Sequence, residues 1–208
     1  MQGGVGFAKS HFKREIFPLS ETLTLLNVLE GVNSRSCPNE LNFHCHTICS
    51  DGSLKPLELF SQASTKGLKH IAVTDHHSIN AYPDLHYLLD QHRNSQTIVP
   101  KLWTGIEISC ILKKCLVHVL GLGFDLSSIS LNPYTTGEAP IGNNLNAENV
   151  VKAIHAAGGL VILAHPARYR VDFVELINEA HKLDFDGIET WYDYEYNENW
   201  RISEFICE

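Results

Sequence analysis

The chain has 208 residues, of which 44% are hydrophobic and 19% are charged, and its formal net charge is −8. This length and composition suit one soluble α/β domain with a full core. The negative charge argues against a broad contact with duplex DNA, whose phosphates are bound by basic surfaces. A short nucleotide held by metal ions and one or two arginines is compatible with an acidic chain.

The sequence contains no apolar run of about 18 residues, so we expect no membrane span and no membrane partner. Its start lacks the basic-then-apolar order of a secretory signal. None of the six cysteines forms a Cys-x-x-Cys pair, which argues against a thiolate zinc site and favours reduced thiols. We therefore expect a cytoplasmic protein.

The first 40 residues carry no motif. Leucines at helical spacing between Leu23 and Leu29 predict an amphipathic helix that ends at Gly31. We expect residues 1–40 to form an N-terminal leader, docked on or dangling from a main domain that spans residues 41–208.

From residue 41 onwards the pattern alternates between strand and helix. This alternation, with strongly apolar strands, predicts a parallel α/β sheet, either open or closed into a barrel. A stretch rich in Ser, Asn, Pro and Gly at 126–145 is expected to be a long loop of the kind that often covers a site. The expected strands are 41–46, 71–73, 98–109, a pair within 110–124 that turns at Lys113-Lys114, 160–164 and 187–190, and the expected helices are 56–67, 84–91, 150–157 and 172–182.

His44 and His46 alternate with the apolar Phe43 and Cys45. In a strand this alternation places both imidazoles on one face, where they can chelate a metal ion. Asp51, five residues further on, can reach the same ion from the following loop as an oxygen ligand. A His-x-His pair alone more often consists of ordinary polar-face histidines, so the interpretation depends on the strand ends that follow.

Further histidines and acids lie within or just after the other apolar strands. Sites of parallel α/β folds lie beyond the carboxyl ends of the strands. The sequence therefore predicts that these side chains meet at one rim. They are Asp75-His76-His77, Glu107, His118 and His165.

In these segments the chain resembles the polymerase and histidinol phosphatase (PHP) family of metal-dependent phosphoesterases. The resemblance spans residues 41 to the end, with the motifs in the family's order. It implies a distorted (β/α)7 barrel, a PHP-type relative of the TIM barrel, with two or three divalent metal ions at its rim. The matching segments are Phe43-His44-Cys45-His46-Thr47 with Ser50-Asp51-Gly52, Ala72–His77, Gly105–Ser109, His118–Leu122, Leu163–Pro166 and Asp186–Glu189.

Carried over to this chain, the resemblance implies seven metal ligands, which are His44, His46, Asp51, His76, Glu107, His118 and His165. His44 and His46 would hold a first metal ion. Glu107 would bridge it to a second, which His118 and His165 also bind. The mixed imidazole and carboxylate shell suits Mn, Zn or Fe better than Mg alone.

Asp51 and His76 would serve a third metal ion, and together with Glu107 they are the expected catalytic residues. The resemblance implies hydrolysis of a phosphate monoester by a hydroxide held on the metal ions. The most similar branch acts on nucleoside 3',5'-bisphosphates and short 5'-phosphorylated oligonucleotides. The implied partner is thus a small phosphorylated nucleotide. The sequence predicts no oligomeric state.

Other polar residues lie beside the expected ligands. Arg168 and Arg170 follow His165 closely and can bind a non-reacting phosphate, with solvated loop arginines as an equal alternative. Asp75 is expected not to bind metal itself but to orient a residue that does. His77 is a ligand, an acid or an exposed residue. The aromatic residues between 191 and 200 can stack on a base, although core packing is favoured.

The chain departs from the family pattern in three places. Asn42 and His77 stand where the family commonly has Asp, and no Ser/Thr-Asp-x-His segment follows Thr190. We therefore expect a C-terminally truncated barrel that binds metal weakly and turns over slowly. One alternative is a catalytically impaired relic. Another is an amidohydrolase, which also begins with His-x-His but typically has a carboxylated lysine where this chain has Glu107.

Overall fold

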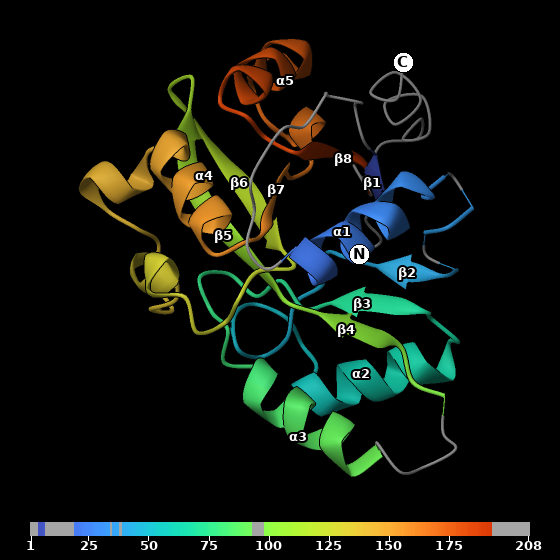
Figure 1. Cartoon of the computed structure of the whole chain (residues 1–208). Coiled ribbons are helices and arrows are strands. Elements are labelled where there is room, and N and C mark those ends of the chain that lie inside the picture. Colours follow the sequence, from blue (N-terminus) through green and yellow to red (C-terminus); the bar gives the residue numbers. More distant parts are fainter. Residues whose placement is uncertain (1–3, 7–18, 34, 38, 93–97, 193–208) are drawn as a thin grey trace.

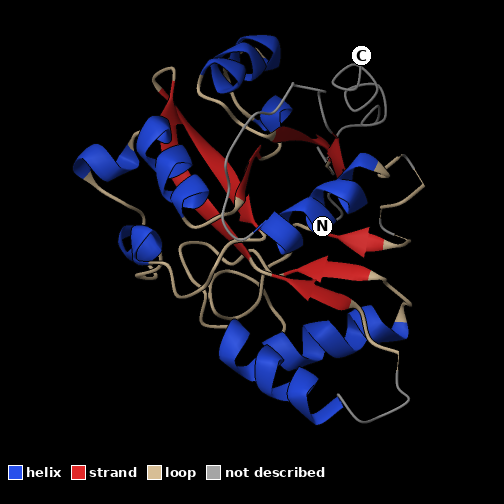
Figure 2. Cartoon of the chain, viewed as in Figure 1, coloured by secondary structure: helices blue, strands red, loops and turns tan. Residues whose placement is uncertain are grey.

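The computed structural model describes residues 4–6, 19–33, 35–37, 39–92 and 98–192 (Figure 1). Strands and helices alternate through most of these residues (Figure 2). The elements are β1 Gly4–Gly6, α1 Leu19–Glu30, β2 Leu41–Asn42, α2 Pro56–Thr65, β3 His70–Ala72, α3 Tyr82–His92, β4 Lys101–Trp103, β5 Gly105–Leu112, β6 Cys115–Leu122, η1 Ile129–Tyr134, η2 Gly142–Leu145, α4 Ala147–Ala156, β7 Leu160–Leu163, η3 Pro166–Arg168, α5 Phe173–Lys182 and β8 Gly187–Trp191.

The strands form a five-stranded sheet, β1-β8-β7-β6-β5, and a three-stranded sheet, β2-β3-β4 (Figure 1). β2, β3 and β4 are parallel, whereas only the β7–β8 pair is parallel in the larger sheet. The chain is therefore an α/β fold with mixed sheets, and the predicted parallel sheet describes only β2-β3-β4 and the β7–β8 pair. The described strands form no closed barrel, so the expected (β/α)7 barrel is not confirmed.

The antiparallel character begins with the hairpin of β5 and β6, which pair along their full length. Lys113 and Lys114 connect them with φ angles of 50° and 63°. Two left-handed residues in succession form the tight hairpin turn whose twist matches that of the strands. The predicted strand pair with its turn at these two lysines is confirmed.

The two sheets meet where β3 ends and β5 begins (Figure 1). Beyond β3, His76 forms an isolated parallel bridge with Glu107 of β5. The Glu107 N–H donates to the Asp75 carbonyl at 3.2 Å, and the His77 N–H donates to the Glu107 carbonyl at 2.9 Å. Gly105 permits this approach, because a Cβ atom there would lie 2.8 Å from the Val73 carbonyl oxygen. The junction therefore brings two of the predicted ligands side by side.

The predicted helices are confirmed, with bounds that differ by a few residues. Pro56 begins α2, where its missing N–H costs no helical hydrogen bond. Asp172 caps α5 by accepting from the N–H groups of Val174 and Glu175. Among the described residues, no helix has the length and apolar character that crossing a membrane requires.

Residues 126–145 are more ordered than the long loop predicted for them. They contain the short helices η1 and η2. Leu131 and Tyr134 of η1 are buried in the same core as β5, β6 and α4. In a 3-10 helix, residues three apart lie on the same face. Leu131 and Tyr134 therefore both face the core, which explains why this segment packs on the domain.

The N-terminal segment packs on the rest of the fold. Leu25 and Leu29 of α1 are buried against Leu41, Phe43 and Leu120. β1 pairs in antiparallel fashion with β8. These contacts explain why the leucines of α1 recur at helical spacing. The division of the chain into an N-terminal leader, residues 1–40, and a main domain, residues 41–208, stays a prediction.

Candidate metal centre

The carboxylate of Glu107 lies at the centre of a cluster of histidines. Its side chain is 1% exposed, and five imidazole nitrogens lie within 3.5 Å of its two oxygens. Oε2 lies 3.1 Å from His44 Nε2, 3.0 Å from His46 Nε2 and 3.5 Å from His76 Nε2, and Oε1 lies 2.9 Å from His118 Nδ1 and 3.2 Å from His165 Nε2.

Hydrogen bonding alone does not explain this cluster. A carboxylate offers about four lone-pair directions, fewer than the five rings around it, and five protonated rings would repel one another. His118 Nδ1 approaches Glu107 without forming a hydrogen bond, and His165 Nδ1 is buried without a partner. Imidazole nitrogens converging on a shared buried carboxylate are a donor set that could hold divalent metal ions.

The ligand atoms fall into three groups, each with its atoms within 4.8 Å of one another. All seven predicted ligands belong to these groups. The grouping differs from the one that the family resemblance implies, because His44 and His46 fall in different groups. The groups are His44, Glu107 and His165; His46, Asp51 and His76; and His76, Glu107 and His118.

His44 and His46 reach the centre although β2 ends at Asn42. The chain beyond β2 keeps an extended alternation, with Phe43 and Cys45 buried in the core. Thr74 holds it in place: its Oγ1 accepts from the Cys45 N–H at 3.1 Å, and its N–H donates to the Cys45 carbonyl at 2.8 Å. The two imidazoles therefore project towards Glu107 without a regular strand.

Asp75 anchors the loop that carries Asp51. Its buried carboxylate accepts from the Thr47 N–H at 2.6 Å, the Thr47 hydroxyl at 2.7 Å and the Ser50 hydroxyl at 2.8 Å. Asp51 Oδ1 lies 2.8 Å from His46 Nδ1, and its side chain is 64% exposed. The fixed loop thus presents an accessible carboxylate at the mouth of the centre.

Glu189 is a residue of the centre that the sequence analysis did not select. It is fully buried on β8, and its Oε1 lies 2.9 Å from His44 Nδ1. Its Oε2 accepts from the His165 N–H at 2.8 Å. His165 has a left-handed backbone, with φ of 30°. The sequence does contain a signal that could have identified Glu189. It is an acidic residue inside an apolar strand, as Glu107 is.

The charges of the centre are coupled. Burial alone would raise the pKa of Glu107, but His44, together with the contacts of His118 and His165, holds it well below its usual value. Burial would lower the pKa of His44, but Glu189 and Glu107 outweigh burial and raise this pKa to about 10. Without metal, the centre therefore holds an ionised Glu107 beside a protonated His44.

His77 is buried, so its interpretation as an exposed residue is wrong. Its Nε2 lies 3.1 Å from the Ser109 hydroxyl rather than at the Glu107 carboxylate. Burial, and then the neighbouring His76 and His118, lower its pKa to about 4. The ring is therefore neutral near pH 7.

Of the two arginines, Arg168 lies at the edge of the centre. Arg168 and Arg170 are both exposed. The Arg168 guanidinium donates to the Tyr192 hydroxyl at 3.3 Å, and the Tyr192 ring lies 4.9 Å from the His165 ring. The other aromatic residues expected to stack on a base or fill the core, up to Trp200, lie outside the described residues, apart from Trp191 at the end of β8.

A cavity of about 550 Å³ opens beside the centre. His46 and Asp51 line one part of it, and Gln62 and Lys66 of α2 line another. It is large enough for a nucleotide-sized ligand.

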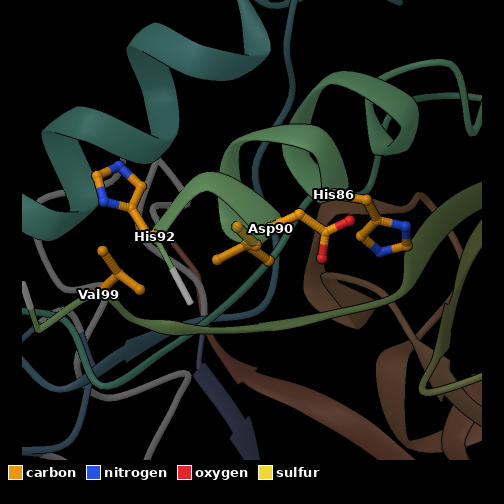
Figure 3. Close-up of a pocket in the computed structure, with 5 residues that line it drawn as sticks. His86, Asp90, His92 and Val99 are labelled. Atoms are coloured by element: carbon orange, nitrogen blue, oxygen red, sulfur yellow. The ribbon is translucent and has the colours of Figure 1, made fainter. Parts of the chain in front are cut away.

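A second cavity, of about 540 Å³, lies along α3 and is shown in Figure 3. In this view His86 and His92 lie on opposite sides of Asp90, whose carboxylate points towards His86. Among the described residues, no three-ligand group includes them. The convergent donors of the described residues belong to the centre around Glu107.

Comparison with known sequences finds relatives that are named as exoribonucleases. It is 29% identical over 153 residues to a 5'-3' exoribonuclease of Haemophilus influenzae, which covers 67% of this chain and 53% of that protein. It is 28% identical over 145 residues to the 5'-3' exoribonuclease Rnm of Salmonella typhimurium, covering 63% of this chain and 48% of that protein. The chain thus spans about half the length of the curated relatives it matches.

Solved structures share the fold. A protein from Bifidobacterium adolescentis assigned as a metal-dependent phosphoesterase aligns with a TM-score of 0.63 and 18% identity, covering 82% of this chain and 83% of that one. An amidohydrolase from Chromobacterium violaceum aligns with a TM-score of 0.58 and 18% identity, covering 72% and 76%. The family profile of the PHP domain matches residues 42–204. The chain belongs to the PHP domain family.

Proposed function

We propose that the chain is a metal-dependent phosphoesterase that hydrolyses phosphate monoesters of nucleotides. The observation that carries the proposal is the convergence of five imidazole nitrogens on the buried carboxylate of Glu107. Two or three divalent ions, of Mn, Zn or Fe, or with lower preference Mg, match this donor set. Such ions lower the pKa of a bound water and neutralise charge on a phosphoryl group.

Each residue of the centre has a distinct role in this proposal. The negative charge of Glu107 holds ligands of two groups together. Glu189 accepts the Nδ1–H of His44, which leaves the Nε2 lone pair facing the centre. Asp51 and His76 act at the open side, where Asp51 is exposed and His76 partly exposed. Together with Glu107 they are the proposed catalytic residues.

The proposed substrate is a nucleoside 3',5'-bisphosphate or a short 5'-phosphorylated oligonucleotide. Two relatives are named as 5'-3' exoribonucleases, which supports a nucleotide. The cavity beside His46 and Asp51 has room for one. Arg168, at the edge of the centre, is proposed to bind a non-reacting phosphate, and Arg170 to assist it. The net charge of −8 opposes duplex DNA as a partner.

The test combines metal content with phosphate release. The purified chain is loaded with Mn, its metal is counted by plasma emission, and phosphate release from adenosine 3',5'-bisphosphate and a 5'-phosphorylated dinucleotide is followed. We expect bound metal and release that a chelator abolishes. A chain that takes up no Mn, Zn or Fe contradicts the proposal. Metal uptake without turnover favours the impaired relic.

A further inference from the structure

The aromatic residue that follows the η3 turn lies against two of the candidate ligands. Tyr169 comes four residues after His165, and the Arg168 N–H donates to the His165 carbonyl at 2.9 Å within this turn. The turn brings the Tyr169 ring to 5.4 Å from the His165 ring. The Tyr169 side chain therefore packs beside the ligand that precedes it in sequence.

The hydroxyl of the same residue reaches the neighbouring strand. Tyr169 Oη accepts a hydrogen bond from the His118 N–H at 2.7 Å. The regular pairing of β6 with β7 ends at Val119 and Leu163, and His118 is the residue of β6 next to this last pair. The His118 carbonyl is held by the Ala164 N–H at 3.1 Å. The carbonyl of His118 is thus held by Ala164, just beyond β7, and its N–H by the Tyr169 hydroxyl.

This arrangement joins ligands of two different groups. His118 belongs with His76 and Glu107, and His165 belongs with His44 and Glu107. The rings of His118 and His165 lie 5.3 Å apart, and Tyr169 contacts both residues. A shift of Tyr169 would therefore move donors of both groups relative to the shared carboxylate.

We propose that Tyr169 is a positioning residue. It holds the His118 backbone and the His165 ring, and so sets the distance between the two groups of candidate metal ligands to which these histidines belong. The proposal rests on the metal-binding function proposed above and assigns Tyr169 no contact with substrate. Outer-shell partners that orient ligands typically contribute about 10- to 100-fold to metal affinity. Tyr169 acts on two ligands at once through one rigid side chain.

The test compares two variants with a matched control. Tyr169→Phe removes the hydroxyl and keeps the ring, whereas Tyr169→Leu removes both. The control is Tyr82→Phe, because the buried Tyr82 hydroxyl also bonds to backbone, with the carbonyls of Val73 and Trp103 at 2.6 and 3.1 Å. Affinity for Mn is measured by competition with a chromophoric chelator, the absorption bands of the cobalt-loaded protein report ligand geometry, and thermal unfolding is followed without metal.

We expect Tyr169→Phe to bind Mn about tenfold more weakly than the wild type and to shift the cobalt bands, with a larger effect for Tyr169→Leu. Tyr82→Phe is expected to unfold at a lower temperature with unchanged affinity and bands. If Tyr169→Phe keeps wild-type affinity and bands, Tyr169 only packs and the inference is overturned. If the wild type itself binds no metal, the proposed function fails and the inference fails with it.

Discussion

His44 and Glu189 form a buried pair in which the imidazole Nδ1 lies 2.9 Å from the carboxylate Oε1. The other ring nitrogen, Nε2, faces Glu107 at 3.1 Å. A carboxylate behind a ligating histidine fixes its tautomer and raises its basicity. Glu189, on the last described strand, thereby controls a ligand that lies 145 residues earlier in the chain.

The first prediction concerns this pair. Glu189→Gln keeps the shape of the side chain but removes its charge, so it no longer favours a correctly oriented, basic His44. We expect metal affinity to fall about 10- to 100-fold, measured by chelator competition. Glu175→Gln, at an exposed acid that pairs with Lys113 on the surface, is the control and should bind normally. Equal affinity of the Glu189 variant would show that this carboxylate does not support the centre.

Glu107 itself should be far less tolerant of change. Glu107→Gln removes the charge that two of the ligand groups share. We expect the loss in affinity to exceed the roughly 100-fold effect of an outer-shell partner, so that plasma emission finds little metal after gel filtration. Glu138→Gln, at an exposed position, controls for the loss of one charge. A Glu107 variant with a full complement of metal would refute the central role of this carboxylate.

Asp75→Asn tests the anchor of the loop that carries Asp51. The carboxylate accepts three hydrogen bonds from Thr47 and Ser50, and an amide would direct its NH2 group at one of these donors. We expect a loss of about 1–3 kcal/mol in the free energy of unfolding without metal, measured by denaturant titration. Ser50→Ala removes one of the three bonds and should cost less. An unchanged midpoint would mean that the loop is held by other contacts.

A substitution at Gly52 tests how closely the loop that carries Asp51 must approach the backbone of His46 and Thr47. A Cβ atom at this position would overlap the backbone carbonyl of His46 and lie 2.6 Å from the Thr47 nitrogen. We expect Gly52→Ala to displace Asp51 and weaken metal binding, seen by calorimetry as the loss of the weakest binding step. Gly31→Ala is the matched control, because its Cβ would meet nothing nearer than the Val28 carbonyl at 3.5 Å. Normal binding by the Gly52 variant would exclude a tight requirement at Asp51.

Metal binding should release protons. The pKa of His44 is raised to about 10 without metal, whereas a ring that ligates through Nε2 and donates through Nδ1 is neutral. Near pH 8, His44 then loses about one proton on binding, so affinity rises with pH by up to about tenfold per unit from this group. Calorimetry in two buffers of different ionisation enthalpy measures the release. A binding heat that is independent of the buffer would contradict the prediction.

Without metal, the same shift makes the stability of the fold depend on pH. Because the folded pKa of His44 lies above the unfolded value, its contribution is full below about pH 6.5 and is lost as the pH rises through about 10. Denaturant midpoints of the metal-free chain between pH 6 and pH 10 follow this loss. The Glu189→Gln variant should lose less over the same range, because one of the two acids that raise the pKa is gone.

The helices could be predicted from the sequence because their signals are local. Pro56 at the start of α2 and Asp172 before α5 mark the helix boundaries directly. The hairpin turn at Lys113-Lys114 was visible because two apolar runs flank two polar residues. The direction of β7 relative to β6 could not be predicted, because Leu160–Leu163 is buried on both faces and such a strand is apolar throughout whichever way its neighbour runs. Pairing partners are a property of the whole fold.

The candidate ligands could also be predicted from local signals in the sequence. The way in which they group around metal ions could not. Each of the seven residues interrupts or follows an apolar strand, where an unpaired polar side chain is costly. Which donors share an ion depends on the junction at which His76 bridges Glu107, a contact between two sheets. Glu189 could not be assigned to the centre from the sequence for the same reason. Its role depends on the contact with His44, which only the folded structure shows.

The bridge between His76 and Glu107 also bears on how the chain assembles. The group of His44, Glu107 and His165 spans separations of 63 and 58 residues, so it draws on both sheets. A cation in this group would bind segments of both sheets at once, so it would bind the folded chain rather than the unfolded one and stabilise the fold by mass action. The centre can form only after the two halves of the molecule have docked. We therefore expect loading with metal to be a late event in folding, which stabilises the finished tertiary arrangement rather than guiding the formation of either sheet.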